Sequence, residues 1–166
     1  MIQIVDATNW IDFDSPIGLI RVFESNGKIT AVNIAVKRSS REPAKPSPLL
    51  IEARKQLEAY FSGKLTNFNL PVDLNNGTEF QKDVWRQISK IGFGKTMSYV
   101  QIAQAIGRPK AARAVGGAVG ANPIPLIVGC HRVMGSTGKI TGYSGGKGIP
   151  TKKWLLKHED ISSSDV

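Results

Sequence analysis

Two capping boxes in the second half of the chain constrain its fold more than any other feature. They are Thr78-Glu79-Phe80-Gln81 and Ser98-Tyr99-Val100-Gln101. In each box, the hydroxyl of the first residue can accept a hydrogen bond from a backbone N–H of the first helical turn. The glutamine side chain reaches back to the backbone of that first residue. Gly92 and Gly107 stop the two helices that these boxes predict. The expected buried stripe of the first helix is Phe80, Val84, Trp85 and Ile88.

A third helix is predicted from Lys110 to about Val119, after the turn Gly107-Arg108-Pro109. Two short helices joined by a tight glycine-containing turn are typical of a helix-turn-helix. The third helix consists almost wholly of small residues, and its central glycines each cost about 1 kcal/mol relative to alanine. Small residues permit close approach, either to another helix or to a nucleic-acid groove. The sequence leaves both interpretations open.

The first half of the chain has a different pattern. Two β-rich runs, 17–23 and 29–36, flank Asn26-Gly27, which is a strong hairpin signal. A proline-rich loop follows, and then a helical stripe that ends at Gly63, formed by Leu50, Ala53, Leu57 and Phe61. We therefore expect an α+β protein of two domains. Residues 1–75 form a small hairpin-plus-helix domain with a connector, and residues 76–166 form a mainly helical domain with the helix-turn-helix.

Charge is distributed unevenly between these halves. The chain of 166 residues has a net charge of +9, of which residues 1–75 contribute +1 and residues 76–166 contribute +8. One-sided basicity is typical of a surface that binds a polyanion such as DNA, although a merely solvated basic face would look the same. No secretory signal or membrane-spanning apolar run is visible, so we expect a cytoplasmic protein with no membrane partner.

The only cysteine, Cys130, directly precedes one of only two histidines, His131. A single cysteine excludes an internal disulfide and a zinc site built from several cysteines. A lone cysteine is more often a buried structural residue than a reactive one. Here the apolar run before it, the adjacent imidazole and the basic half favour a nucleophile that acts on DNA. The final helix, predicted from Thr151, carries Trp154 and His158 and ends near Glu159.

Several short stretches occur in one fixed order over about half of the chain. They are Phe80-Gln81-x-x-Val84-Trp85, Ser98-Tyr99-x-x-Ile102-Ala103, Ala112-Arg113-Ala114-Val115-Gly116, Asn122-Pro123, Cys130-His131-Arg132-Val133, Gly142-Tyr143 and Lys153-Trp154-Leu155-Leu156. With these stretches the chain resembles the methylated-DNA–protein-cysteine methyltransferases, also called O-6-alkylguanine-DNA alkyltransferases. The first half resembles that family's N-terminal, ribonuclease-H-like domain only in size and in its strand-then-helix order.

The resemblance implies DNA repair by irreversible, single-turnover transfer of the alkyl group from O-6-alkylguanine to Cys130. O-4-alkylthymine is a second candidate substrate. No cofactor and no metal are implied. The implied partner is double-stranded DNA, bound through the minor groove by a monomer that flips the damaged base out of the stack. Arg113 would fill the vacated space, and Lys110, Ala112, Ala114 and Tyr99 would contact the DNA. Asn122, Val133, Tyr143 and Ser144 would form the substrate pocket, with Asn122 also tying down the loop before the cysteine.

The expected chemistry follows from the thiol. Displacement at an alkyl carbon requires a thiolate, and His131 is the expected base. Neighbours on an extended segment point to opposite sides, so we expect a water to bridge Cys130 and His131. Glu159 would hold the imidazole, and Tyr99 would donate a hydrogen bond to the leaving guanine.

The residues around these groups carry further expectations. The family usually has proline where this chain has Gly129, and glycine should loosen the backbone there. Arg132 is expected to pair with a carboxylate or with carbonyls. Trp85 and Trp154 are expected in the core, and His158 at the surface.

Two alternatives accompany this hypothesis. A DNA-damage binder of the same fold would scan lesions without reacting, and its expected mark is the absence of the thiol. A cysteine hydrolase or acyl transferase would use Cys130 and His131 but needs an oxyanion hole, and it leaves the basic helix-turn-helix unexplained.

Overall fold

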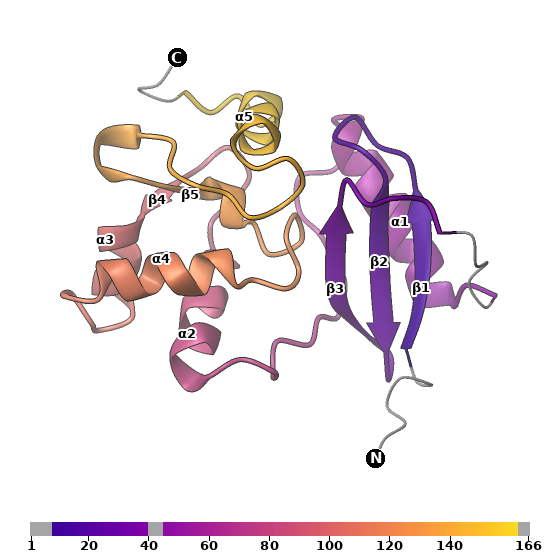
Figure 1. The fold of residues 1–166 in the computed structure, drawn as a ribbon, viewed down its shortest axis with the longest axis horizontal. Helices are drawn as coiled ribbons and strands as arrows, with labels where there is room; N and C mark the ends of the chain where they lie inside the picture. Colours follow the sequence, from indigo (N-terminus) through magenta and orange to yellow (C-terminus); the bar gives the residue numbers. More distant parts are fainter. Residues whose placement is uncertain (1–7, 40–44, 163–166) are drawn as a thin grey trace. The chain divides into compact units, whose positions relative to one another are not determined.

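The computed structural model describes residues 8–39 and 45–162, which form two compact units, Met1–Asp73 and Leu74–Val166. The first unit is α+β. Its antiparallel sheet has the order β1 (Thr8–Phe13), β2 (Ile20–Ser25) and β3 (Lys28–Ile34). Helix α1 (Pro48–Phe61) packs on this sheet (Figure 1).

The hairpin predicted at Asn26-Gly27 is confirmed. Both residues have positive φ, 53° and 77°, as a tight turn matched to the twist of its strands requires. The strand bounds differ from those predicted. Residues Ile17 and Gly18 form a turn before β2, with φ of 107° at Gly18, and a positive φ at Ala35 ends β3 early.

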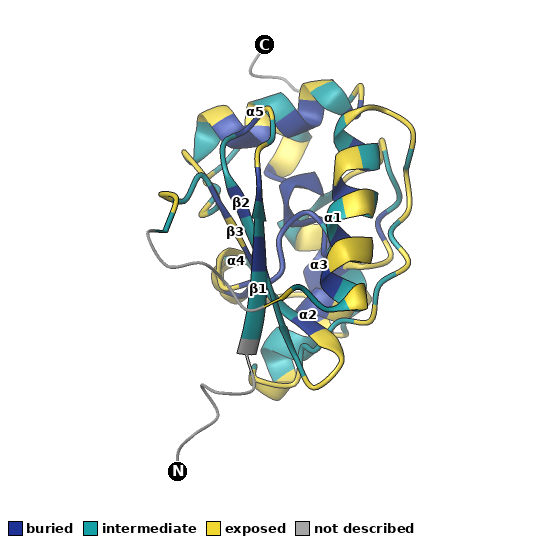
Figure 2. Cartoon of the chain, turned by 90° about the vertical axis from the view of Figure 1, so that its right-hand side faces the viewer, coloured by how far each residue is buried: buried dark blue, intermediate teal, exposed yellow. Residues whose placement is uncertain are grey.

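Helix α1 begins where Ser47 accepts a hydrogen bond from the Leu50 backbone. Its buried residues are Leu50, Ala53, Leu57 and Tyr60. The predicted stripe was therefore wrong at one position, because Tyr60 is buried and Phe61 only half-buried. Figure 2 shows the resulting division of α1 into a buried and an exposed face.

The second unit is mainly helical. It contains α2 (Glu79–Ile88), α3 (Tyr99–Ala105), α4 (Ala112–Gly120) and α5 (Ile149–His158). Two short strands, β4 (Met97–Ser98) and β5 (Val133–Met134), pair in parallel. Two 3-10 turns, η2 (Cys130–Arg132) and η3 (Ser136–Gly138), flank β5.

Both predicted capping boxes are confirmed at the starts of α2 and α3. Helix α4 packs against α2 and α3 (Figure 1), and the indole of Trp85 donates to the Ala118 carbonyl at 2.8 Å. The expectation that Trp85 lies in the core is confirmed. Phe80, predicted to be buried, is only half-buried. Helices α2, α3 and α4 therefore form one packed cluster in the second unit.

Two predicted helix starts were wrong by two residues. Helix α4 begins at Ala112 rather than Lys110, because residues 108–111 form a separate turn in which the Ala111 backbone bonds to the Arg108 carbonyl. Helix α5 begins at Ile149 rather than Thr151, with Pro150 in its first turn. Proline suits that position because its missing N–H has no helical partner there. None of the helices in the described part of the chain is long and apolar enough to cross a membrane.

Candidate active site

The loop between α4 and η2 brings Cys130 to its place. Asn122 holds this loop, since its amide donates to the Val128 carbonyl and its carbonyl accepts from the Ile124 backbone, both at 2.9 Å. A backbone bond from Val128 back to Ile124 closes the loop. The thiol that follows is 4% exposed. Asn122 therefore makes the tie that was expected of it, through atoms that are themselves buried.

Cys130 and His131 do not lie on an extended segment, and that prediction was wrong. They form the 3-10 turn η2, closed by a bond from the Arg132 backbone to the Gly129 carbonyl at 3.0 Å. The turn allows Arg132 and His131 to reach the same carboxylate. Its geometry thus depends on contacts that are distant in sequence.

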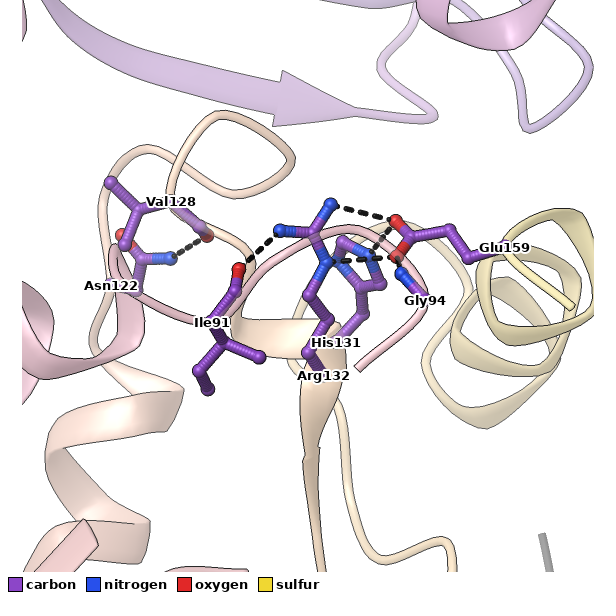
Figure 3. A network of polar contacts seen from close by, with 7 residues as sticks. All are labelled: Ile91, Gly94, Asn122, Val128, His131, Arg132 and Glu159. Atoms are coloured by element: carbon purple, nitrogen blue, oxygen red, sulfur yellow. Dashed lines mark hydrogen bonds and ion pairs between the residues drawn. The ribbon is translucent and has the colours of Figure 1, made fainter. Parts of the chain in front are cut away.

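Glu159 is the centre of a buried polar network (Figure 3). One of its oxygens lies 2.6 Å from Nε2 of His131. The guanidinium of Arg132 binds both carboxylate oxygens, at 2.8 and 3.0 Å, and also donates to the Ile91 carbonyl. The backbone of Gly94 donates to Glu159 as well. Arg132 thus pairs with a carboxylate and a carbonyl, as expected.

The bond to Glu159 determines which nitrogen of His131 can act as a base. A carboxylate only accepts hydrogen bonds, so Nε2 of the neutral ring must carry the proton and Nδ1 must keep a free lone pair. Nδ1 is buried and has no hydrogen-bond partner among the described residues. A basic atom is therefore available on the ring that adjoins Cys130.

Burial opposes ionisation of both the cysteine and the histidine. It raises the pKa of the Cys130 thiol, and nearby polar groups of Asn122 and Tyr143 and the charge of Lys152 offset part of this effect. Burial also lowers the pKa of His131, although Glu159 acts in the opposite direction. The resting pair is thus a thiol beside a neutral imidazole, which is the state from which proton transfer must begin.

A cleft of about 370 Å³ opens in the second unit. It is lined by Tyr99, Gly116, Val119, Gly120, Gly142, Tyr143 and Ser144. Tyr143 belongs to this lining and also influences Cys130, so it links the open cleft to the thiol. Gly116 and Gly120 of α4 contribute only backbone to the wall of the cleft.

The other predicted site residues fall into distinct places. The hydroxyl of Tyr99 lies 2.7 Å from Oγ1 of Thr141, and Ser144 donates to the Gly120 carbonyl at 2.8 Å. Val133 is fully buried in β5 and is not among the residues that line this cleft, so its place in the substrate pocket stays a prediction. Its carbonyl accepts a hydrogen bond from Lys152.

Four of the residues predicted to contact DNA lie at or just before the start of α4, and the fifth, Tyr99, is the first residue of α3. Lys110, Arg113 and Ala114 are exposed, and Ala112 is half-buried. No acidic residue occurs among them. This end of the helix therefore presents three exposed cations, Arg108, Lys110 and Arg113, beside small side chains.

Lys152 was not predicted from the sequence to belong to the site. This residue is 1% exposed, and its ammonium donates to the carbonyls of Val133 at 2.6 Å and Thr141 at 3.4 Å. A signal was present, because Lys152 lies three, four and seven positions before Leu155, Leu156 and Glu159, which places all four on one helix face.

Trp154 was predicted to lie in the core, and the structure contradicts this. It is half-buried, and its ring stacks on His158 with centroids 4.9 Å apart. Positions 154 and 158 are one turn apart on the helix face adjacent to the buried one. His158 thus has a partner that the sequence analysis had not assigned.

Comparison with known proteins gives consistent results for both halves. The model of the 6-O-methylguanine DNA methyltransferase DNA-binding domain matches residues 79–161, and that of the ribonuclease-like domain of the same proteins matches residues 10–74. The methylated-DNA–protein-cysteine methyltransferase of Mycolicibacterium paratuberculosis is 46% identical over 151 residues, covering 88% of each chain. That of Methanosarcina barkeri is 53% identical over 109 residues, covering 66% of this chain and 67% of the relative.

Among solved structures, Mycobacterium tuberculosis OGT in complex with DNA superposes with a TM-score of 0.79 at 44% identity. The match covers 91% of this chain and 92% of that one. The similarity therefore extends over both units in sequence and in fold.

Proposed function

This chain belongs to the 6-O-methylguanine DNA methyltransferase family, and we propose that Cys130 is the residue that receives the alkyl group. The protein repairs DNA by moving the alkyl group from O-6 of guanine to its own cysteine. Cys130 is the only cysteine in the chain. The observation that carries the assignment is the buried His131, which is held by Glu159 through Nε2 and whose Nδ1 has no partner among the described residues.

The proposed proton path starts at the thiol. Nδ1 of His131, the ring nitrogen that Glu159 leaves free, takes the proton of Cys130, and Glu159 stabilises the imidazolium that forms. The sulfur then attacks the alkyl carbon. The S–C bond forms as the C–O6 bond breaks, and the electron pair of that bond moves onto the guanine. Tyr99 donates a proton to the guanine as its negative charge develops, and the proton held by His131 then passes through solvent to the Tyr99 phenolate, so the proton lost by the thiol is balanced by the one gained by the base.

The α4 surface is proposed to hold the DNA through the minor groove. Flipping the damaged base costs a few kcal/mol, and Arg113 would fill the space that the base leaves. Lys110 would contact a phosphate, while Ala112 and Ala114 let the helix approach closely. The flipped base would enter the cleft lined by Tyr99, Tyr143 and Ser144.

Two consequences distinguish this function from the alternatives. A thioether has no low-energy route back to a thiol, so each molecule reacts once. The chain has the thiol that a non-reacting damage binder was expected to lack. Repair of O-4-alkylthymine, a monomeric state and a cytoplasmic location stay predictions.

The test is the intact mass of the protein after incubation with duplex DNA that contains O-6-methylguanine. We expect a gain of one methyl group, located on the peptide that contains Cys130. Undamaged duplex should leave the mass unchanged, and Cys130→Ala should bind the damaged duplex without gaining mass. An unchanged wild-type mass with DNA in excess would refute the assignment.

A further inference from the structure

Lys152 is a buried cation to which the proposed reaction gives no part. It lies in the first half of α5, and its side chain reaches Val133, where η2 ends and β5 begins. Its ammonium is bonded to the backbone carbonyls of Val133 and Thr141. Carbonyl oxygens carry only partial charges, so these bonds solvate the ammonium without neutralising it.

Lys152 has no carboxylate within ion-pair distance among the residues that the structure describes. The nearby carboxylate, Glu159, is already bound by Arg132 and His131. Burial accordingly lowers the pKa of Lys152 to about 8. An unpaired buried charge is costly, and the chain retains one here beside the reactive cysteine.

The geometry points to the anion that would pair with it. Lys152 holds the carbonyl of Val133, and the backbone N–H of Val133 donates to the carbonyl of Cys130. The ammonium is thus fixed to the turn that carries the thiol. The charges of Cys130 and Lys152 attract each other, and each group favours the charged form of the other.

Charge in the site changes when the thiol loses its proton. The new positive charge on His131 faces Glu159, which already balances Arg132. The new negative charge on the sulfur is not balanced by this network, because both of its cations face Glu159. The positive charge of Lys152 disfavours the imidazolium, so it assists the reaction only through the sulfur.

We propose that Lys152 is the counter-ion of the Cys130 thiolate, a positioning residue that holds the turn η2 and stabilises the sulfur anion before alkyl transfer. The inference rests on the proposed function for its role in repair. The effect on the thiol itself can be measured without DNA.

The test uses the single cysteine as its own probe. The rate of Cys130 alkylation by iodoacetamide is followed against pH in the wild type and in K152M, K152Q and K152R. Without the ammonium, the midpoint of this profile should move to higher pH, so K152M and K152Q should react at least tenfold more slowly at neutral pH. K152Q keeps a donor for the Val133 carbonyl, which separates loss of charge from loss of the bond. K152R should react faster than either.

Lys153→Met is the matched control, because it removes the same charge from the next, exposed position of α5. Its profile should match that of the wild type. Below about pH 8 the folded protein bears the cost of a buried ammonium that the unfolded chain hydrates, and removing this cost offsets part of the loss of the Val133 hydrogen bond, so K152M should still unfold cooperatively in urea. Unfolding of all three variants under native conditions would overturn the proposal, since the lysine side chain itself would then be needed for the fold.

Methyl transfer from damaged duplex should fall in the same order as the iodoacetamide rate. Wild-type profiles in K152M and K152Q would overturn the role of Lys152. Failure of the wild type to accept a methyl group would refute the proposed function instead, while the iodoacetamide profiles would still decide the role of Lys152.

Discussion

Glu159 binds two side chains that reach it from the turn after the cysteine, and it is 2% exposed. Glu159→Gln would leave the Arg132 guanidinium buried without its counter-charge. Loss of one partner from a buried pair costs about 3–5 kcal/mol. We therefore expect the free energy of unfolding of the second unit to fall by about that amount in urea.

Asp83→Asn provides the control for this substitution, because it removes one carboxylate from an exposed pair with Arg86 in the same unit. An exposed ion pair contributes about 0–1 kcal/mol. If the two variants unfolded at the same urea concentration, Glu159 would not be the anchor that its contacts indicate.

At the scale of single residues, the sequence identified the candidate reacting groups but not how they are held. Cys130, His131 and Glu159 were identified because few residue types perform this chemistry and the motif fixes their order. The turn η2 was missed because a three-residue segment has no periodicity to read. Its form depends on Arg132, which bonds to Ile91 and Glu159 far away in the sequence.

The same limit applies to Gly129. Glycine was expected to loosen this position, yet its φ is −73°, which is within the range that proline imposes. A side chain here would meet the guanidinium of Arg132, since an added Cβ would lie 3.0 Å from Nη1. With glycine in place of the family's proline, φ at position 129 still lies in the range of proline, and the missing side chain leaves space for the guanidinium of Arg132.

Among the helices, α4 combines poor helix formers with an exposed face. Gly117 is exposed, and a Cβ added there would meet nothing within 4 Å. Gly117→Ala should therefore stabilise the protein by about 0.5–1 kcal/mol through helix propensity. If α4 enters the groove with its backbone close to DNA, the same methyl group should weaken DNA binding several-fold.

Urea unfolding and a DNA titration of Gly117→Ala measure the two effects separately. Gly63→Ala is unsuitable as a control, because Gly63 has a φ of 81° that alanine rarely adopts. Lys64→Ala, at an exposed position of the first unit, should leave both quantities nearly unchanged. Greater stability with unaltered affinity would show that this face of α4 does not approach the DNA closely.

The elements themselves were predictable where local signals were strong. Two capping boxes and the Asn26-Gly27 turn were sufficient for α2, α3 and the β2–β3 hairpin. Strand β1 was missed because its alternation of apolar and polar residues covers only Ile11, Asp12 and Phe13, and its pairing with β2 provides the hydrogen bonds that define it. Strands β4 and β5 have two residues each, which is too short for any pattern.

For the whole molecule, the uneven charge predicts how DNA binding responds to salt. Residues 76–166 carry nearly all of the net charge of +9. Each phosphate contact makes the slope of the logarithm of the DNA association constant against the logarithm of the salt concentration steeper by about 0.9. Using Cys130→Ala to prevent reaction, we expect a slope of about −2 or steeper. The slope should be the same for damaged and undamaged duplex, because an alkyl group carries no charge.

Two lysine variants locate the origin of this slope. Lys110→Ala should reduce it by about 1 through loss of one phosphate contact at the start of α4. Lys64→Ala removes the same charge from the first unit and should leave the slope unchanged, even though both variants lower the net charge equally. Equal effects of the two would mean that binding follows total charge, and the assignment of DNA contacts to α4 would then have to be abandoned.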